Sequence, residues 1–283
     1  MTTNLNRSEA VRKYFTKTPV EPSKPNYQSH QTKIGIGGGL LLLALILFSS
    51  GKAFPIFLGI VSGYFGSKFL TNGFSSYSRE KKKYEKTLNE YREKFSMAEP
   101  KPSDEQIDEW MENDIEKIVK EAIIKLDLQD EDVKAKPFMI GGPASQLKET
   151  KYASGKDEKT RYSHFEILVV FLTDYHVAAY QSINSMEIGQ PLTDKTQEFP
   201  YKEITNLGTE TVKHEFYLIN GKSIKENGLQ AFILATSGAN LINIGYRFAR
   251  NIDSQGELIK IGGEHTISAI RKKLQDYKQK YER

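Results

Sequence analysis

Apolar residues are unevenly distributed along the chain, and one block near the N-terminus is almost free of charge. The stretch from Ile34 to Gly51 has 18 residues and no charge, and as a helix with a rise of about 1.5 Å per residue it would be roughly 27 Å long. A second stretch, from Ala53 to Phe74, is interrupted only by Lys68. A hydrocarbon core is about 30 Å thick. The pattern therefore predicts two transmembrane helices, over 34–50 and 53–72, joined by a short polar turn.

Two alternatives to this hairpin remain open. A hairpin buried inside a soluble protein would need a large apolar surrounding, because helices that are hydrophobic all round must be enclosed. No other part of the chain is apolar enough to enclose them. A re-entrant hairpin, which enters the bilayer and returns, is the second alternative, because both stretches are short and Pro55 lies near the start of the second.

The glycines at 35–39 and the Gly51-Lys52 pair suggest a phosphate-binding loop, but their spacing does not fit one. A dinucleotide fingerprint needs a third glycine where Leu40 stands, and a P-loop needs a glycine at the position of Ile46. Both nucleotide interpretations therefore fail, and we expect no cofactor.

Basic residues flank the apolar block on both outer sides, whereas its turn carries Lys52 alone. They are Arg7, Arg12, Lys13, Lys17, Lys24 and Lys33 before the block, and Lys68, Arg79, Lys81, Lys82, Lys83 and Lys86 after it. Loops rich in Lys and Arg stay in the cytoplasm. We therefore expect a multi-pass protein of the inner (cytoplasmic) membrane of a bacterial-type cell, with both termini in the cytoplasm.

Small residues recur at four-residue spacing in the second predicted span. They are Gly59, Ser62, Gly63 and Gly66. Such spacing lets two helices approach closely in lipid. The other helix of the same hairpin is the first expected partner, and contact between subunits is the alternative.

The segment 75–130 is predicted to be a cytoplasmic helical hairpin, or stalk. Asn72-Gly73 indicates a break, and Ser75-Ser76 offers a new N-cap. Apolar residues then follow at steps of 4, 3 and 4, which is typical of a coiled coil or of one packed helix. This stalk seam consists of Tyr84, Leu88, Tyr91 and Phe95. The basic residues Lys68, Arg79, Lys81, Lys82 and Lys83 either contact anionic lipid headgroups or form a solvated helix face.

A second helix of the stalk is predicted to begin at Ser103, which forms a capping box with Gln106. Its apolar stripe is Ile107, Trp110, Met111, Ile115, Ile118, Ala122 and Leu126, and its opposite face is acidic. We expect this acidic helix to fold back on the basic one.

The segment 131–283 contains seven strand-like runs separated by turn dipeptides such as Asn220-Gly221, followed by one amphipathic helix. Such a succession is sufficient for a small barrel or a pair of orthogonal sheets. The chain is therefore predicted to be an α+β membrane protein, with a polar N-terminal arm (1–32), the apolar block (33–74), the stalk and this β domain.

Two motifs in the β domain are similar to those of the pleckstrin-homology-like (PH-like) superfamily, in its bacterial PH and GRAM-type branches. "FEILVVFLTDYHVAAY" (165–180) resembles the L-T-D/N-x-R hairpin, and "EFPYKEITNLGTETV" (198–212) resembles the I-P-hydroxyl/aromatic-x-x-I strand. The resemblance implies a seven-strand barrel closed by the C-terminal helix, with a binding or scaffolding role. Two departures limit it: the closing helix has no tryptophan, and Lys156, Lys159 and Arg161 are interleaved with acidic residues.

Candidate catalytic or metal-binding residues are few. The chain has no cysteine, so thiolate sites are excluded. The histidines His30, His164, His176, His214 and His265 show no metal-ligand spacing. His164 and His176 could lie opposite each other across a strand hairpin, and Arg247 with Arg250 could receive an anion, but structural or solvated roles are expected for both pairs.

These patterns favour a non-enzymatic membrane protein that presents a PH-like binding or assembly domain as a homo-oligomeric scaffold. Its expected partners are the lipid bilayer, further copies of the chain and an unidentified protein. The net charge of +4 does not suggest nucleic acid. An oligomeric pore gated by the cytoplasmic domain is the alternative function, and an enzyme is the third.

Overall fold

The computed structural model describes residues 6–50, 52–129, 137–237, 241–246, 249–252, 258–261 and 263–281. The chain forms two compact units: Thr18–Met97 is one, and Met1–Lys17 together with Ala98–Arg283 is the other. The larger unit is therefore discontinuous, because the smaller one is inserted after its first helix. The segment 1–32, expected to be a polar arm, is divided between the two units.

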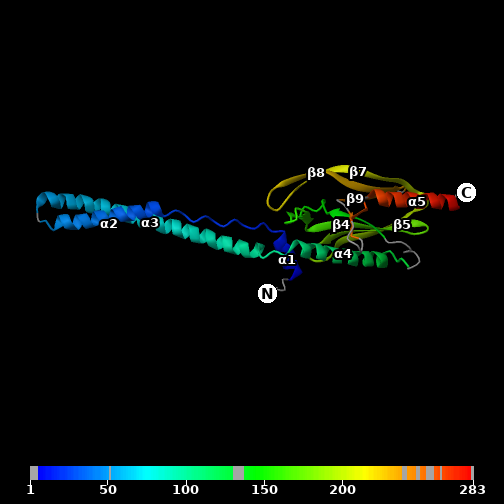
Figure 1. Cartoon of the computed structure of the whole chain (residues 1–283), viewed down its shortest axis with the longest axis horizontal. Coiled ribbons are helices and arrows are strands. Elements are labelled where there is room, and N and C mark those ends of the chain that lie inside the picture. The colour runs from blue at the N-terminus through cyan, green and yellow to red at the C-terminus, as the bar shows by residue number, and fades with distance from the viewer. Residues whose placement is uncertain are drawn as a thin grey trace. The chain divides into compact units, whose positions relative to one another are not determined.

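Both helices and strands occur, which confirms the α+β class (Figure 1). The helices are α1 (Arg7–Tyr14), α2 (Gln28–Phe48), α3 (Ala53–Ala98), α4 (Asp104–Lys125), the 3₁₀ turn η1 (Tyr201–Glu203) and α5 (Gly263–Tyr281). The strands are β1 (Phe138–Pro143), β2 (Tyr152–Ser154), β3 (Thr160–Tyr162), β4 (His164–Leu172), β5 (His176–Ser185), β6 (Gln190–Pro200), β7 (Ile204–Tyr217), β8 (Ser223–Thr236), β9 (Leu241–Tyr246), β10 (Ala249–Ile252) and β11 (Leu258–Ile261).

The smaller unit contains the two apolar helices, α2 and α3, which lie antiparallel (Figure 1). The predicted helix break at Asn72-Gly73 is wrong, because α3 is continuous over 46 residues. A Cβ atom on Gly73 would lie 2.8 Å from the Ile34 side chain. This glycine therefore permits close contact with α2 instead of ending the helix. The expected boundary between the apolar block and the stalk falls inside one helix.

An extended segment precedes α2 and belongs to the same unit. Pro19, Pro22 and Pro25 are half-buried, whereas the residues between them are exposed. A period of three is that of a polyproline II helix, which rises about 3.1 Å per residue. The nine residues from Thr18 to Asn26 would then extend roughly 28 Å, and the next residue, Tyr27, contacts the Tyr77 ring of α3 at 4.9 Å.

The larger unit is built on a four-stranded antiparallel sheet, in the order β1-β4-β5-β6. Phe165, Ile167 and Val169 of β4 lie in one core cluster with α1 and α4. Leu168 and Val170 lie in a second cluster with the three-stranded sheet β7-β8-β9 and α5. Figure 1 shows α4 on one side of this sheet and β7, β8 and α5 on the other. Because both faces are covered, β4 is a nearly continuous apolar run.

The predicted partner of α4 is wrong, although its start and its stripe are right. The Ser103 side chain caps the helix by accepting from the Gln106 N–H. Ile107, Ile118 and Ala122 are buried in the cluster that includes β4 and β5. The apolar stripe that was expected to cover the basic helix therefore covers the sheet. A sheet offers a wider apolar surface than the single seam of α3, so this burial is favoured.

The strands form separate sheets, and no closed barrel is found among the described residues. The motif at 198–212, expected to be one strand, is divided by a corner at Pro200 and η1. Proline has no N–H for a ladder, so the four-stranded sheet ends there. The described residues form eleven strands where seven were expected, because the two-stranded sheets β2-β3 and β10-β11 accompany the four-stranded and three-stranded ones.

A hydrogen bond joins this corner to the turn between β4 and β5. The buried Tyr201 hydroxyl donates to the Thr173 carbonyl at 2.9 Å, and burial raises the Tyr201 pKa. The Thr173 hydroxyl oxygen accepts from the backbone N–H groups of Tyr175 at 3.2 Å and His176 at 3.1 Å. The two motifs that carry the family resemblance are therefore in contact.

Replacing Tyr201 with Phe should lower the free energy of unfolding by about 1 kcal/mol, because a buried acceptor loses its donor. Chemical denaturation followed by circular dichroism measures the change. Tyr217→Phe is the matched control, since Tyr217 is 65% exposed and its loss should be close to neutral. Equal effects of the two substitutions would contradict a structural role for this hydrogen bond.

Candidate functional site

The outer surface of the α2–α3 hairpin is apolar and exposed. Both helices are long and apolar enough to cross a membrane, and only 11% of either apolar window is buried. Large side chains at least 60% exposed are Leu42, Leu45, Ile46, Phe54, Phe57 and Tyr64. The core helix of a soluble protein would bury these groups. An apolar surface of this size indicates an interaction site.

The inner surface of the hairpin is made of small residues. A Cβ on Gly37 would lie 2.7 Å from the Leu70 nitrogen and 2.8 Å from the Gly66 oxygen, both backbone atoms. A Cβ on Gly59 would lie 3.3 Å from the Ala44 oxygen. The two backbones therefore approach closely at glycines on both helices.

Three of the four predicted packing residues lie on this inner surface. Gly59, Gly63 and Gly66 face α2, whereas the Ser62 hydroxyl donates to the Gly59 carbonyl of its own helix at 3.2 Å. The contact seen is the one within the hairpin. A contact between subunits through these glycines stays a prediction.

Gly37→Ala should destabilise the hairpin by about 1–3 kcal/mol, because the new methyl group meets backbone atoms that cannot rotate away. The adjacent Gly38→Ala is the control, since a Cβ there has nothing within 4 Å and alanine favours a helix. Thermal loss of the helical circular dichroism signal in mild detergent measures both. Equal stability of the two variants would contradict the close approach.

A polar pair lies at the base of the hairpin. His30 is 9% exposed, and its Nε2 is 2.9 Å from Glu80 Oε2. Tyr27 and Tyr77 form an edge-to-face pair. Aromatic rings with polar tips are typical of a membrane–water interface. Sequence reasoning missed the pair of His30 and Glu80, because the two residues are 50 positions apart along the chain.

The stalk seam and the basic residues lie on α3. Tyr84, Leu88 and Tyr91 are half-buried and Phe95 is 40% exposed. Lys68, Arg79, Lys81, Lys82 and Lys83 are all exposed. Of these, Lys81 lies 4.0 Å from Glu85. Neither a coiled-coil partner nor a lipid contact is tested by this geometry, so both roles stay predictions.

A dense ionic cluster joins α1, α4 and β3. Arg161 is 7% exposed and forms two hydrogen bonds of 2.7 Å with Asp108 and further bonds with Asp157. Tyr14 donates to Asp104 at 2.7 Å. Burial alone would lower the Arg161 pKa, but the bonds to Asp108 and Asp157 outweigh it and keep that pKa raised. Burial, followed by the bond to Asp104, raises the Tyr14 pKa. These groups satisfy one another and leave Arg161 unavailable to an anionic ligand.

A second pair, Arg7 and Asp114, fixes α1 on α4. The Arg7 guanidinium binds both carboxylate oxygens of Asp114, and its Nε donates to the Met186 carbonyl at 3.0 Å. The Asp114 side chain is 3% exposed. The sequence analysis counted Arg7 only as a flanking charge. The signal that could have found the pair is Asp114 itself, a carboxylate next to the apolar stripe.

Arg7→Met should lower the free energy of unfolding by about 3 kcal/mol, because a buried carboxylate loses its main partner. Arg12→Met is the matched control: Arg12 is 63% exposed in its pair with Glu187, and exposed pairs contribute about 0–1 kcal/mol. Urea unfolding followed by circular dichroism compares them. If both variants cost the same, α1 is not fixed by this buried pair.

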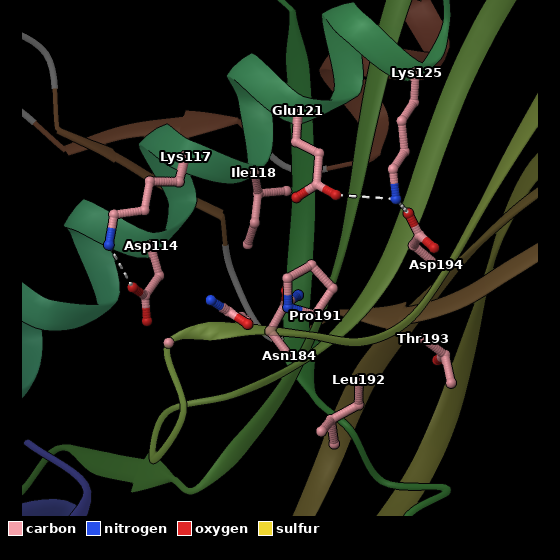
Figure 2. Close-up of a pocket in the computed structure, with 12 residues that line it drawn as sticks. Asp114, Lys117, Ile118, Glu121, Lys125, Asn184, Pro191, Leu192, Thr193 and Asp194 are labelled. Atoms are coloured by element: carbon pink, nitrogen blue, oxygen red, sulfur yellow. Dashed lines mark hydrogen bonds and ion pairs between the residues drawn. The ribbon is translucent and has the colours of Figure 1, made fainter.

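A groove of about 430 Å³ lies between α4 and the β5–β6 hairpin (Figure 2). Its charged side chains bind one another: Lys125 binds Asp194 and Glu121, and Lys117 lies 3.7 Å from Asp114. The hydrogen bond from the Lys125 ammonium lowers the pKa of the Asp194 carboxyl. The groove is therefore polar but internally neutralised.

Figure 2 shows Asn184 beside Pro191, with which it pairs in the β5–β6 ladder. Asn184 is 1% exposed and donates to Ser182 Oγ at 2.9 Å. Among the described residues, its side-chain oxygen has no partner. One acceptor suits water or another donor, but it does not specify a ligand or a reaction.

The remaining candidates are separated from one another. His164 and His176, which could have faced each other across a strand hairpin, do not: in the β4–β5 ladder His164 pairs with Ser185, so the two histidines lie at opposite ends. The described residues contain no cluster of metal-ligand type. Arg247 lies outside the described residues, as does Gly51. For Arg250 only the strand position, opposite Lys260, is described.

Comparison of the chain with protein-family models, with curated proteins and with solved structures gives no significant match.

Proposed function

We propose that the protein is an integral membrane protein anchored by the α2–α3 hairpin. The observation that carries this proposal is the exposed apolar surface around a tightly packed glycine interior. Burying such a surface in lipid gains roughly 25 cal/mol per Å², whereas water would disfavour it. The flanking charges support an orientation with the turn outside and both termini in the cytoplasm of a bacterial-type inner membrane.

The chain connectivity supports the same arrangement. α1 precedes the hairpin and α4 follows it, yet both belong to one compact unit. Within that unit, the Lys101 ammonium donates to the Tyr14 carbonyl at 3.4 Å. The two ends of the inserted segment therefore start from neighbouring points. A hairpin that crosses twice returns to the side from which it started.

We further propose that the β domain acts as a PH-like binding or assembly module at the cytoplasmic surface, in a homo-oligomeric scaffold. Its four-stranded and three-stranded antiparallel sheets, with a helix at the C-terminal end, support this proposal, as does the contact between Tyr201 and Thr173. The commitment of Arg161 to Asp108 and Asp157 argues against an anion-binding loop at β3.

The pore alternative has no comparable support. A pore needs polar groups turned toward a lumen, but the hydroxyls of Ser62 and Ser67 donate to carbonyls of their own helix at 3.2 and 2.9 Å. We therefore retain the scaffold as the proposal.

Single-cysteine labelling tests the topology, because the chain has no cysteine of its own. Ser50→Cys, in the turn, should react with a membrane-impermeant maleimide in intact spheroplasts. Ser96→Cys, near the end of α3, should react only after permeabilisation. Both positions are exposed, so accessibility of the thiol depends on the membrane alone.

Two results would contradict the proposal in different ways. If both cysteines need permeabilisation while the protein resists alkaline carbonate extraction, the hairpin is re-entrant. If carbonate releases the protein, it is not integral to the membrane. A strictly monomeric mass in mild detergent would count against the homo-oligomer.

A further inference from the structure

We propose that one face of α3 binds the headgroups of anionic phospholipids; this inference rests on the proposed insertion of the hairpin. The face consists of Arg79, Lys82, Lys83 and Lys86. A helix turns about 100° per residue, so these four lie within an arc of roughly 100°. The seam of Tyr84, Leu88 and Tyr91 falls on the opposite side of the same helix.

The position of this face along α3 fits the headgroup layer. Phe74, 56% exposed, is the last large apolar residue exposed before Phe95. Arg79 follows five residues later, or about 8 Å along the axis. Lipid headgroups occupy roughly 5–8 Å on each side of the hydrocarbon core. The backbone of Arg79 therefore lies at the outer edge of the headgroup layer, and the other three residues of the face lie farther from the hydrocarbon core.

The direction of the side chains extends their reach. In an α-helix each Cα–Cβ bond tilts toward the N-terminus. The N-terminal half of α3 is the apolar one, starting at Ala53, so the side chains of the basic face lean back toward the bilayer. Lysine and arginine can then place their charges in the headgroup layer. On a helix of the reverse direction the same residues would lean away.

Three of the four charges of this face are unpaired among the described residues, and the fourth, Lys86, makes only a long contact with an exposed carboxylate. Arg79, Lys82 and Lys83 have no carboxylate within 4.0 Å in the described part of the chain, and Lys86 is 4.0 Å from the exposed Glu90. The two nearest carboxylates are turned elsewhere, Glu80 to His30 and Glu85 to Lys81. A fixed cationic face next to an apolar surface is complementary to an anionic leaflet.

The test measures which lipids gather around this face. A donor fluorophore is attached to the full chain through Ser78→Cys, an exposed position one residue before Arg79. The labelled protein is reconstituted in vesicles of phosphatidylcholine and phosphatidylglycerol. Energy transfer is measured to acceptor-labelled phosphatidylglycerol and, separately, to acceptor-labelled phosphatidylcholine. Each basic residue near an anionic leaflet favours lipid binding about fivefold. Transfer to phosphatidylglycerol should therefore exceed transfer to phosphatidylcholine at low ionic strength and fall toward it at high salt.

Two triple variants separate the site from the general charge of the protein. Arg79→Gln/Lys82→Gln/Lys83→Gln removes three of the four charges of the face and should abolish most of the excess transfer to phosphatidylglycerol. Arg271→Gln/Lys272→Gln/Lys278→Gln, on exposed positions of α5, removes the same charge and should leave the preference unchanged. Circular dichroism checks that each variant is folded.

Any other result contradicts either the lipid preference or the insertion of the hairpin. Equal transfer to both lipids in the unmodified sequence overturns the lipid preference, and a loss that is equally large in the α5 variant assigns it to net charge. In either case, transfer to both acceptors still reports a hairpin in the bilayer. Absence of transfer to either acceptor would instead overturn the proposed function, on which this inference rests.

Discussion

The docking of α1 onto α4 is the constraint on which the architecture depends. It brings residues from both sides of an 80-residue insertion, Thr18–Met97, into one compact unit. Closing such a loop costs conformational entropy that grows only slowly with its length. The buried pair of Arg7 and Asp114 and the apolar contacts of Val11 and Phe15 offset that cost.

The smaller unit has two antiparallel halves of different structure. One half is the long helix α3, and the other is the extended segment Thr18–Asn26 followed by the shorter helix α2. α3 has 46 residues and α2 has 21, so the helices alone differ in length. The extended segment Thr18–Asn26 rises about twice as much per residue as a helix. Its nine residues would cover roughly 28 Å, close to the roughly 27 Å of α3 between Tyr77 and Phe95. Proline at every third position fits this use, because it disfavours a helix.

Sequence reasoning succeeded where one segment decides its own structure. The apolar helices, the Ser103 cap and the stripe from Ile107 to Leu126 all follow from local periodicity and local hydrogen bonding. It failed where the deciding partner is distant. Gly73 was taken as a helix end because its contact with Ile34 lies 39 positions away, and Arg161 was related only to its acidic neighbours in sequence because Asp108 lies 53 positions away. Spacing alone cannot distinguish a glycine that ends a helix from one that admits a neighbour.

The discontinuous unit also has a consequence for the order of synthesis. Translation produces α1 first, then both apolar helices, and only afterwards α4 and the strands that bury Val11, Tyr14 and Phe15. The larger unit therefore cannot close on α1 until the whole hairpin has left the ribosome. During that interval the core residues that α4 and the strands supply to α1 have not yet been made. Docking of α1 can therefore occur only in a chain in which both apolar helices have already been synthesised.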